Sequence, residues 1–357
     1  METLQDLIAR WDGEFVVATL DRATDTWIFL AIHDTTLGPA LGGLRMHTYS
    51  TPADGLRDAM RLAEGMTHKW AALGIARGGG KSVLAVPQPL TGAARHAVLH
   101  RVGRIVATFG GAYACGPDLG TTPADMRTVN DVTEHAHGWD HRRDRPLDPG
   151  PYTALGVHSG MRAALRQVFG SDAFSGRTVL VQGVGDVGVP LARRLAAAGA
   201  TVVLSDVDEG RARRLAAEFG TTVVAPDAVY AHPCDVYAPC AVGATLNSTT
   251  VPRLRCRIVA GSANNQLAEP ADGDRLHARD ILYAPDYVIN AGGAAALPAL
   301  SAGSDEESVL ERVRAIEHTL DEIFTEARAH TEAPAATARR RVERILAEGR
   351  ARARASD

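Results

Sequence analysis

The chain has 357 residues, more than one ordinary hydrophobic core accommodates, so we expect two domains. Its 45% hydrophobic and 22% charged residues are typical of a soluble globular protein. A net charge of −4 and a pI near 6.4 argue against a general nucleic-acid-binding protein.

The cysteines and the N-terminus bear on the compartment. The four cysteines form no C-x-x-C pair and no disulfide framework, which favours reduced thiols and a cytoplasmic protein. We see no metal-binding spacing among the thirteen histidines. The segment Met1–Asp6 is acidic and lacks a signal-peptide core, and no run reaches ~18 apolar residues, so we expect neither export nor a membrane span.

The chain begins with a predicted β-hairpin. Two apolar runs, Phe15–Leu20 and Trp27–Ile32, flank a turn-like stretch, which indicates two strands joined by a moderately long loop. The next segment, Gly38–Met46, is predicted to be a loop because Gly42 and Gly43 are adjacent. Their N–H groups could bind a carboxylate, although a turn is the simpler interpretation.

Apolar residues then recur every three or four positions from 54 to 73, which predicts a helix with one buried stripe. Lys69 lies beside that stripe. No acidic residue lies three or four positions from it on the helix, so its partner must come from elsewhere in the chain or from a ligand.

Lys81 follows three glycines and leads into the apolar run 82–87, which predicts an interior strand. The glycines remove side chains that would keep a ligand away. Lys69 and Lys81 could instead be surface residues, where lysine usually is. A phosphate-binding loop is excluded because the motif needs glycine where this chain has Ile75, and because the segment leads from a helix into a strand.

Asp118 stands out in the next part of the chain. A helix is predicted over residues 91–109, and a short strand then leads into the loop that carries Asp118. The better cap for the following helix is Thr122, directly before Pro123. Asp118 therefore has no evident structural role, which makes it a candidate functional residue.

A proline-rich stretch, residues 138–152, has no apolar period and is predicted to be the interdomain linker. A helix follows from Thr153 through Val168. We expect residues 1–148 to form an N-terminal α/β substrate and catalytic domain, completed by the C-terminal helix at about 335–357. Residues 149–334 would form the dinucleotide-binding domain, with an interdomain cleft.

A dinucleotide-binding fingerprint opens the second domain. An apolar strand leads into Gly183-x-Gly185-x-x-Gly188, and a helix follows. A second strand delivers Asp206 eighteen residues later, close to the ~20 expected for the acid that binds the ribose hydroxyls. This context predicts a Rossmann-type, doubly wound sheet that binds NAD. A glycine-rich turn without a cofactor is the structural alternative.

A carboxylate at Asp206 would repel a 2′-phosphate, which favours NAD over NADP, whereas Arg211, Arg213 and Arg214 nearby leave NADP open. Further strands are expected at 223–224, 234–238, 257–260 and 287–289. The polar loops that follow, 239–241, 261–266 and 290–293, would lie where such a sheet binds ligands.

Two helices are expected to end the chain. One runs through Val309 and Ile323 and stops before Pro334, and the last spans residues 335–352. The arginines of the last helix indicate a solvated or subunit-facing surface, with nucleic-acid binding a distant alternative.

Seven motifs occur in the order found in the glutamate/leucine/phenylalanine/valine dehydrogenase family, and the chain resembles its branch acting on leucine, valine or phenylalanine. The similarity spans nearly the whole chain and is carried by Gly38–Met46, Gly65–Lys69, Gly78–Lys81, Pro117–Thr122, Gly183–Gly188, Gly261–Gln266 and Asp286–Gly293.

The resemblance implies NAD-dependent, reversible oxidative deamination of an apolar L-amino acid by a homo-oligomer that binds neither nucleic acid nor membranes. Lys69 would hold the substrate α-carboxylate, helped by the backbone of Gly42 and Gly43 and by Asn264. Lys81 would be the catalytic lysine and Asp118 the acid/base. These roles agree with the chemistry, which needs a carboxylate clamp and groups that move protons.

The resemblance also implies a cofactor set and a side-chain pocket. The cofactor would contact Arg45, Thr153, Gly183, Gly185, Asp186, Val187, Gly188, Asp206, Pro239, Cys240, Ala263 and Asn264. The pocket positions hold Leu41, Gly116, Ala294 and Leu297. After Gly293 the chain continues with three alanines, where close relatives have larger apolar residues, which leaves the preferred side chain open.

Two other function classes fit parts of the pattern. One is a dehydrogenase for another substrate, such as a hydroxy acid or glutamate, although the chain is short for the glutamate branch. The other is a non-catalytic NAD-binding sensor on the same scaffold. NADH formation with a panel of L-amino acids distinguishes these two classes from a dehydrogenase that acts on apolar amino acids.

Overall fold

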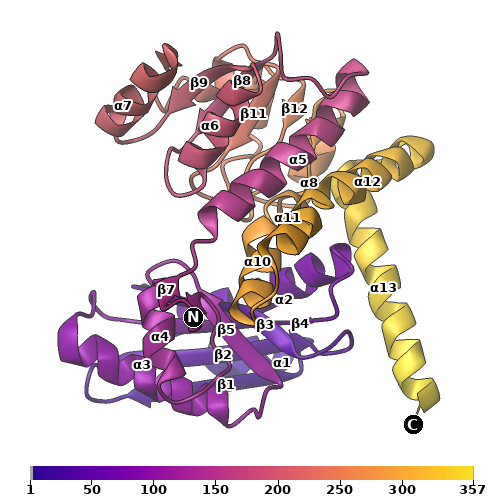
Figure 1. Ribbon diagram of the computed structural model, residues 1–357. Helices are drawn as coiled ribbons and strands as arrows, with labels where there is room; N and C mark the ends of the chain where they lie inside the picture. Colours follow the sequence, from indigo (N-terminus) through magenta and orange to yellow (C-terminus); the bar gives the residue numbers. More distant parts are fainter. Residues whose placement is uncertain (1–2, 357) are drawn as a thin grey trace. The chain divides into compact units, whose positions relative to one another are not determined.

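The computed structural model describes residues 3–356 and divides into two compact units (Figure 1). The first unit comprises Met1–Leu147, Leu297–Gly303 and Val342–Asp357, and the second comprises Asp148–Ala296 and Ser304–Arg341. Each unit is built on its own sheet. The prediction of a two-domain α/β protein is thereby confirmed.

The sheet of the first unit has the strand order β1-β2-β4-β3-β5. Strands β1 and β2 form the expected antiparallel hairpin, and β4 lies between β2 and β3. Strands β4, β3 and β5 run parallel to one another. The strands span Phe15–Asp21 (β1), Thr26–Asp34 (β2), Ala40–His47 (β3), Gly78–Ala85 (β4) and Tyr113–Pro117 (β5).

Helices cover both faces of this sheet. Helices α1 (Leu4–Arg10) and α2 (Pro52–Ala72) pack on one face, where Met60 of α2 and Val83 of β4 share a buried cluster. We call this the α2 face. Helices α3 (Gly92–Ala107) and α4 (Pro123–Asn130) pack on the other face around residues such as Leu84, Leu99 and Met126. The prediction that Thr122 caps α4 is confirmed.

Two expectations for the first unit are wrong. Residues 38–46 are mostly strand β3, because the segment pairs with β4 on one side and β5 on the other, and this ladder outweighs the turn preference of two adjacent glycines. Residues 138–147 are not a linker: β6 (Trp139–Asp140) and β7 (Arg145–Pro146) form a short ribbon in which Trp139 is buried.

The second unit contains a parallel sheet with the order β10-β9-β8-β11-β12-β13. This is the doubly wound order with a switch point beside its first strand, as the fingerprint predicts. The strands span Thr178–Gln182 (β8), Thr201–Ser205 (β9), Thr222–Val223 (β10), Val236–Pro239 (β11), Ile258–Val259 (β12) and Leu282–Tyr283 (β13).

Helix α5 (Gly150–Phe169) packs against α6 (Gly188–Ala197), α11 (Glu306–Arg314) and α12 (Ile316–His330). On the side of the parallel sheet that faces away from α5, a separate hydrophobic cluster includes Leu180, Tyr237, Val259 and Leu276. The remaining elements are α7 (Glu209–Phe219), η1 (Val229–Ala231), η2 (Val251–Arg253), α8 (Ala271–His277) and α9 (Asp286–Ile289).

Two expectations for the second unit need correction. Residues 287–289 are helix α9 and not a strand, because a short buried apolar run does not distinguish the two and Pro285 directly precedes it. The expected long helix through Val309 and Ile323 is two helices, α11 and α12, which meet at Ala315.

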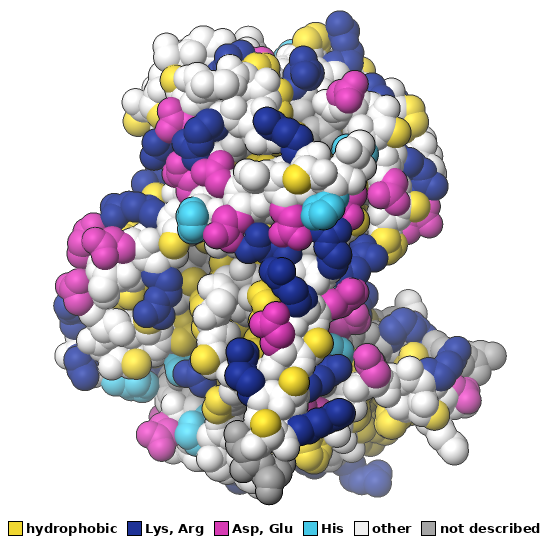
Figure 2. All heavy atoms as spheres, turned by 90° about the vertical axis from the view of Figure 1, so that its right-hand side faces the viewer, with side chains coloured by type: hydrophobic (Ala, Val, Ile, Leu, Met, Phe, Trp, Pro, Cys, Tyr) yellow, Lys and Arg dark blue, Asp and Glu magenta, His cyan; other side chains and the backbone are white. Residues whose placement is uncertain are grey.

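Two helices carry residues of both units: α10 (Gly292–Ser301) and the last helix, α13 (Pro334–Ser356). Figure 2 shows Lys/Arg side chains interspersed with apolar ones along the exposed side of α13. Arg344 and Arg354 are exposed there, whereas Val342 and Leu346 are buried, as expected for one apolar stripe. Arg350 binds the buried carboxylate of Asp34 at 2.6 Å.

The four cysteines form no disulfide among residues 3–356. Among residues 3–356, no helix is both long enough and apolar enough to cross a membrane.

Candidate active site

The central strands of the first unit bring one set of side chains to the α2 face. Successive residues of a strand point to opposite faces, and Leu44 of β3 and Leu84 of β4 belong to the core on the α3 side. Gly43 and Arg45 of β3 and Lys81 of β4 therefore lie on the α2 face. Sheet pairing, and not sequence proximity, assembles this group.

Lys81 and Asp118 form an ion pair, with Nζ 3.0 Å from Oδ2. Arg45 donates from Nε to the same Asp118 oxygen at 2.8 Å. Lys81 is 4% exposed, so the alternative that it is a surface lysine is wrong. The structure thus brings together three residues that the sequence had marked separately, on β4, on β3 and after β5.

A second carboxylate orients Arg45. Asp58 of α2 accepts a hydrogen bond from Arg45 Nη1 at 2.9 Å and another from the Tyr49 hydroxyl at 2.7 Å. Sequence reasoning missed Asp58 and Tyr49, because the contact depends on Arg45 being in a strand that faces α2. The available signal was the placement of Arg45 between Leu44 and Met46, an apolar–charged–apolar alternation typical of a strand.

The electrostatics of this group follow from burial and pairing. Burial lowers the pKa of Lys81, because the ammonium loses hydration, although the Asp118 carboxylate opposes that shift. Burial alone would raise the pKa of Asp118, but the charges and hydrogen bonds of Lys81 and Arg45 outweigh it and lower that pKa to about 2. Asp118 is therefore a carboxylate at neutral pH.

The glycines near Lys81 serve packing more than ligand access. A Cβ on Gly79 would lie 2.1 Å from Oγ1 of Thr67 on α2, and one on Gly80 would lie 2.6 Å from the Tyr113 ring. The expectation that these glycines expose backbone to a ligand is wrong. Gly43 differs, since a Cβ there would lie 2.7 Å from Asp118 Cβ and 2.8 Å from Lys81 Nζ.

Lys69 is in the last turn of α2 and is 9% exposed. Its turn is fixed to the sheet, because the neighbouring Trp70 indole donates to the Leu41 carbonyl at 3.0 Å. Trp70 thereby anchors the Lys69 turn to strand β3, which also carries Gly43.

The loop that carries Asp118 is tied down at several points. Thr121 Oγ1 accepts from the Asp118 N–H at 2.9 Å and donates to the Leu44 carbonyl at 2.7 Å. Arg95 of α3 donates to the Gly120 carbonyl at 2.8 Å. These bonds hold the carboxylate in place beside Lys81 without the help of a ligand.

The expected pocket positions are small or apolar in the structure. Leu41 is buried on β3, and a Cβ on Gly116 of β5 would meet only the His137 carbonyl, at 3.7 Å. Gly116 thus borders free space. Ala294 and Leu297 lie one turn apart on α10.

In the second unit, the fingerprint forms the turn between β8 and α6. A Cβ on Gly188 would lie 1.9 Å from the Gly183 carbonyl, so the helix can approach the strand only with glycine there. A Cβ on Gly185 would meet nothing within 4 Å, so this backbone, followed by Asp186 and Val187, faces open space. An open glycine turn at a helix N-terminus fits the pyrophosphate of a dinucleotide.

Asp206 directly follows β9, the position of the ribose-binding acid in this fold. Its carboxylate accepts from the Val184 N–H and the Asp208 N–H, both at 2.8 Å, and binds Arg211 at 3.1 Å. Asp206 therefore pairs with Arg211, one of the three arginines whose positive charge had left NADP binding possible.

Of the other residues expected at the cofactor, Arg45 lies on β3 of the first unit, where it binds Asp118 and Asp58, and Pro239 is the last residue of β11. The rest lie beyond β11 and β12 and in the first turn of α5. The Ala263 N–H donates to the Pro239 carbonyl at 2.9 Å, and the neighbouring Cys240 thiol has a pKa raised by burial. Asn264 Oδ1 accepts from Asn290 Nδ2 at 2.7 Å. Thr153 Oγ1 accepts from the Gly293 N–H at 3.1 Å.

Comparison with known proteins identifies the family. Residues 23–135 match the family described as Glu/Leu/Phe/Val dehydrogenase, dimerisation domain, and residues 204–347 match Glutamate/Leucine/Phenylalanine/Valine dehydrogenase. The chain belongs to this family of amino-acid dehydrogenases. The predicted resemblance is confirmed.

Individual relatives agree with this assignment. The chain is 41% identical to leucine dehydrogenase of Bacillus cereus over 89% of its own length and 87% of that protein. It is 39% identical to valine dehydrogenase of Streptomyces albus, over 95% and 93% respectively. Its fold matches L-tryptophan dehydrogenase from Nostoc punctiforme with a TM-score of 0.82 and 36% identity, over 97% of this chain and 99% of that one.

Proposed function

We propose that the protein catalyses the NAD-dependent, reversible oxidative deamination of an apolar L-amino acid to the 2-oxo acid and ammonia. The observation that carries the proposal is the ion pair between the buried Lys81 and the partly exposed Asp118, held by Arg45 on the α2 face. Relatives named for leucine, valine and tryptophan support an apolar side chain.

Each residue of the group has a distinct task in this proposal. Lys69 binds the substrate α-carboxylate with the N–H groups of Gly42 and Gly43, and Asn264 assists. The Lys81 ammonium stabilises negative charge that develops on the carbinolamine oxygen. Bound NAD supplies the acceptor for the hydride that leaves Cα. Water then adds to the imine carbon, and loss of ammonia gives the oxo acid.

The coupling between Lys81 and Asp118 gives the pair its proton chemistry. A carboxylate whose pKa is about 2 is a weak base at neutral pH. When Lys81 loses its proton, one of the two positive charges that hold down the pKa of Asp118 disappears while Arg45 remains, and the carboxylate becomes more basic. In the proposed reaction, Asp118 then takes a proton from the amine or from the attacking water.

The proposal assigns one role to each unit. The first unit binds and activates the amino acid, and the second binds NAD through Gly183–Gly188, Asp206 and the loops after β11 and β12. The family description of residues 23–135 as a dimerisation domain supports a homo-oligomer.

The direct test is NADH formation by the purified protein with a panel of L-amino acids that includes leucine, valine, phenylalanine, tryptophan and glutamate, with 2-hydroxy acids as controls. We expect turnover with the apolar amino acids only. Turnover of hydroxy acids or glutamate alone would overturn the substrate class, and NAD binding without any turnover would indicate a sensor.

The cofactor preference depends on Asp206. We expect Asp206→Asn to raise the KM for NAD on the order of tenfold to a hundredfold, the usual effect of losing a hydrogen bond to a charged group, and to narrow the gap to NADP. The amide can still accept the Val184 N–H bond, so the turn persists. Steady-state kinetics with both cofactors measure the effect.

Asp208→Asn is the matched control, because Asp208 lies in the same loop but caps α7. It is expected to leave the NAD/NADP ratio unchanged. A wild-type protein that already prefers NADP would show that the role given to Asp206 is wrong.

A further inference from the structure

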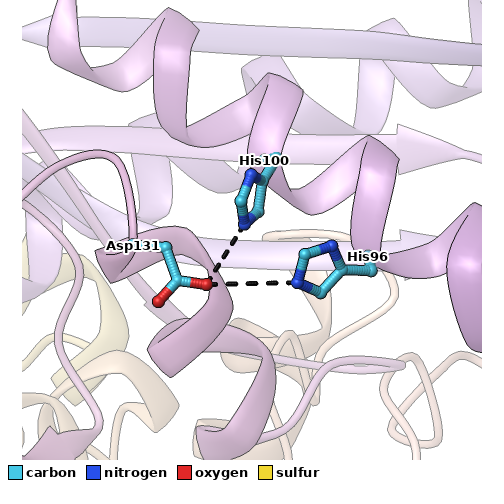
Figure 3. A group of neighbouring side chains, drawn as sticks. All are labelled: His96, His100 and Asp131. Carbon is cyan, nitrogen blue, oxygen red and sulfur yellow. Dashed lines mark hydrogen bonds and ion pairs between the residues drawn. The ribbon is translucent and has the colours of Figure 1, made fainter.

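Three metal-ligating side chains converge on the α3–α4 side of the first unit, away from the α2 face. His96 and His100 are four residues apart on α3 and thus on one helical face, and Asp131 is the C-cap residue of α4. Figure 3 shows both rings turned toward the carboxylate. His100 Nε2 lies 3.1 Å and His96 Nε2 lies 4.0 Å from the same oxygen, Oδ2.

We propose that His96, His100 and Asp131 form a binding site for a divalent transition-metal ion such as Zn²⁺, which would clamp α3 to α4. The spacing of the thirteen histidines in the sequence does not by itself predict a metal site. The signal was the His-x₃-His pair in a helix, which needs a third ligand from another element to become informative.

The distances fit a zinc ion. Bonds of about 2.0–2.1 Å in a tetrahedron place the ligand atoms about 3.3 Å apart. The observed separations of 3.1 and 4.0 Å bracket this value, and all three donor atoms lie within 4.8 Å of one another. Small side-chain rotations would complete the arrangement. Two imidazoles and one carboxylate are ligands that zinc accepts.

The supporting helices fix the donor positions. At one end, Arg95 of α3 binds both oxygens of Asp125 on α4, at 2.8 and 2.7 Å. At the other end, a Cβ on Gly103 of α3 would lie 2.2 Å from Val132, so the segments are in close contact. His96 and His100 lie between these two points, and metal binding would therefore need little rearrangement.

Exposure defines what kind of site this is. The side chains of His96 and Asp131 are 59% and 52% exposed, and that of His100 is 27% exposed. Water can therefore fill the remaining coordination position, and the ion can exchange with solvent. A structural role is favoured, because Lys81 and Asp118 lie on the other face of the sheet.

The simpler alternative is a hydrogen bond between His100 and Asp131, with His96 as a neighbour. The two explanations differ in one respect: metal binding requires all three side chains. The neighbouring His96 ring, whose centroid lies 4.3 Å from that of His100, contributes nothing in the alternative.

The test is isothermal titration of the untagged, chelator-treated full chain with Zn²⁺. We expect one equivalent per chain bound through this site, and a melting temperature that rises by a few °C at zinc concentrations well above Kd. His96→Ala, His100→Ala and Asp131→Asn are each expected to weaken binding by more than about tenfold and to remove the thermal shift.

His318→Ala is the matched control. His318 forms an exposed i,i+4 pair with Glu322, with 3.2 Å between Nε2 and Oε1, but no histidine stands three or four positions from it in the sequence of α12. This variant should bind zinc as the wild type does. Unchanged zinc binding in His96→Ala, loss in His318→Ala, or no wild-type binding would each overturn the proposal. Circular dichroism shows whether each variant is folded. If another variant misfolds, the test uses His96→Gln, which changes an exposed side chain.

Discussion

Replacing Asp118 with Asn is expected to lower kcat on the order of 10²- to 10⁴-fold, the range typical of general acid–base groups. The amide keeps the shape of the side chain and can still accept a bond from Arg45, but it cannot take a proton. The KM for the amino acid should change much less, because the contacts to the α-carboxylate lie elsewhere. Steady-state kinetics on the best L-amino acid measure the effect.

Lys69→Ala provides the contrast. It removes the charge proposed to meet the α-carboxylate before and during hydride transfer, so it should mainly raise KM. NAD affinity, measured separately by fluorescence, should be unchanged in both variants. Full kcat in Asp118→Asn would refute the acid/base role, and weakened NAD binding in both variants would mean that the group is structural.

Lys81→Arg is expected to reduce kcat by a similar factor and, in addition, to change the pH profile. Burial lowers the pKa of Lys81 from its ordinary value of 10.5, so the neutral amine forms at a lower pH than it does for a solvated lysine. If deamination requires that neutral form, kcat/KM rises with pH through the lowered pKa. Arginine keeps the positive charge beside Asp118 but does not lose its proton in this range.

The measurement is the pH dependence of kcat/KM for both proteins with one substrate. Ionisation of the substrate amine affects both profiles equally, so the difference between them isolates Lys81. A rise with pH that persists unchanged in Lys81→Arg would exclude proton exchange by this lysine.

Short sequence patterns correctly predicted the helices and strands that are determined by residues close together in the chain. The β-hairpin, the helix that carries Lys69 and the strand before Gly183 each have a clear apolar period and turn residues at their ends, and all three are present. Asp118 was identified by elimination, since Thr122 had already accounted for the cap of α4. The family resemblance supplied the remaining roles, which chain order alone does not reveal.

What the sequence could not predict depends on contacts between distant segments. Strand β3 was missed because its glycines favour a turn until β4 and β5 pair on either side. The bond between Arg45 and Asp58 follows only from that strand. Likewise, His96 and His100 become meaningful only when Asp131, more than thirty residues away, reaches them.

The composition of the first unit has a consequence for its biosynthesis. Because this unit includes Val342–Asp357 as well as Met1–Leu147, the ribosome must translate that late segment before the unit can be complete. Until then, the carboxylate of Asp34 lacks Arg350, and the apolar surface that receives Val342 and Leu346 stays uncovered. The N-terminal half of the nascent chain therefore stays partly assembled until the segment from position 342 onward has been translated, and a stop codon before position 342 would leave the first unit incomplete.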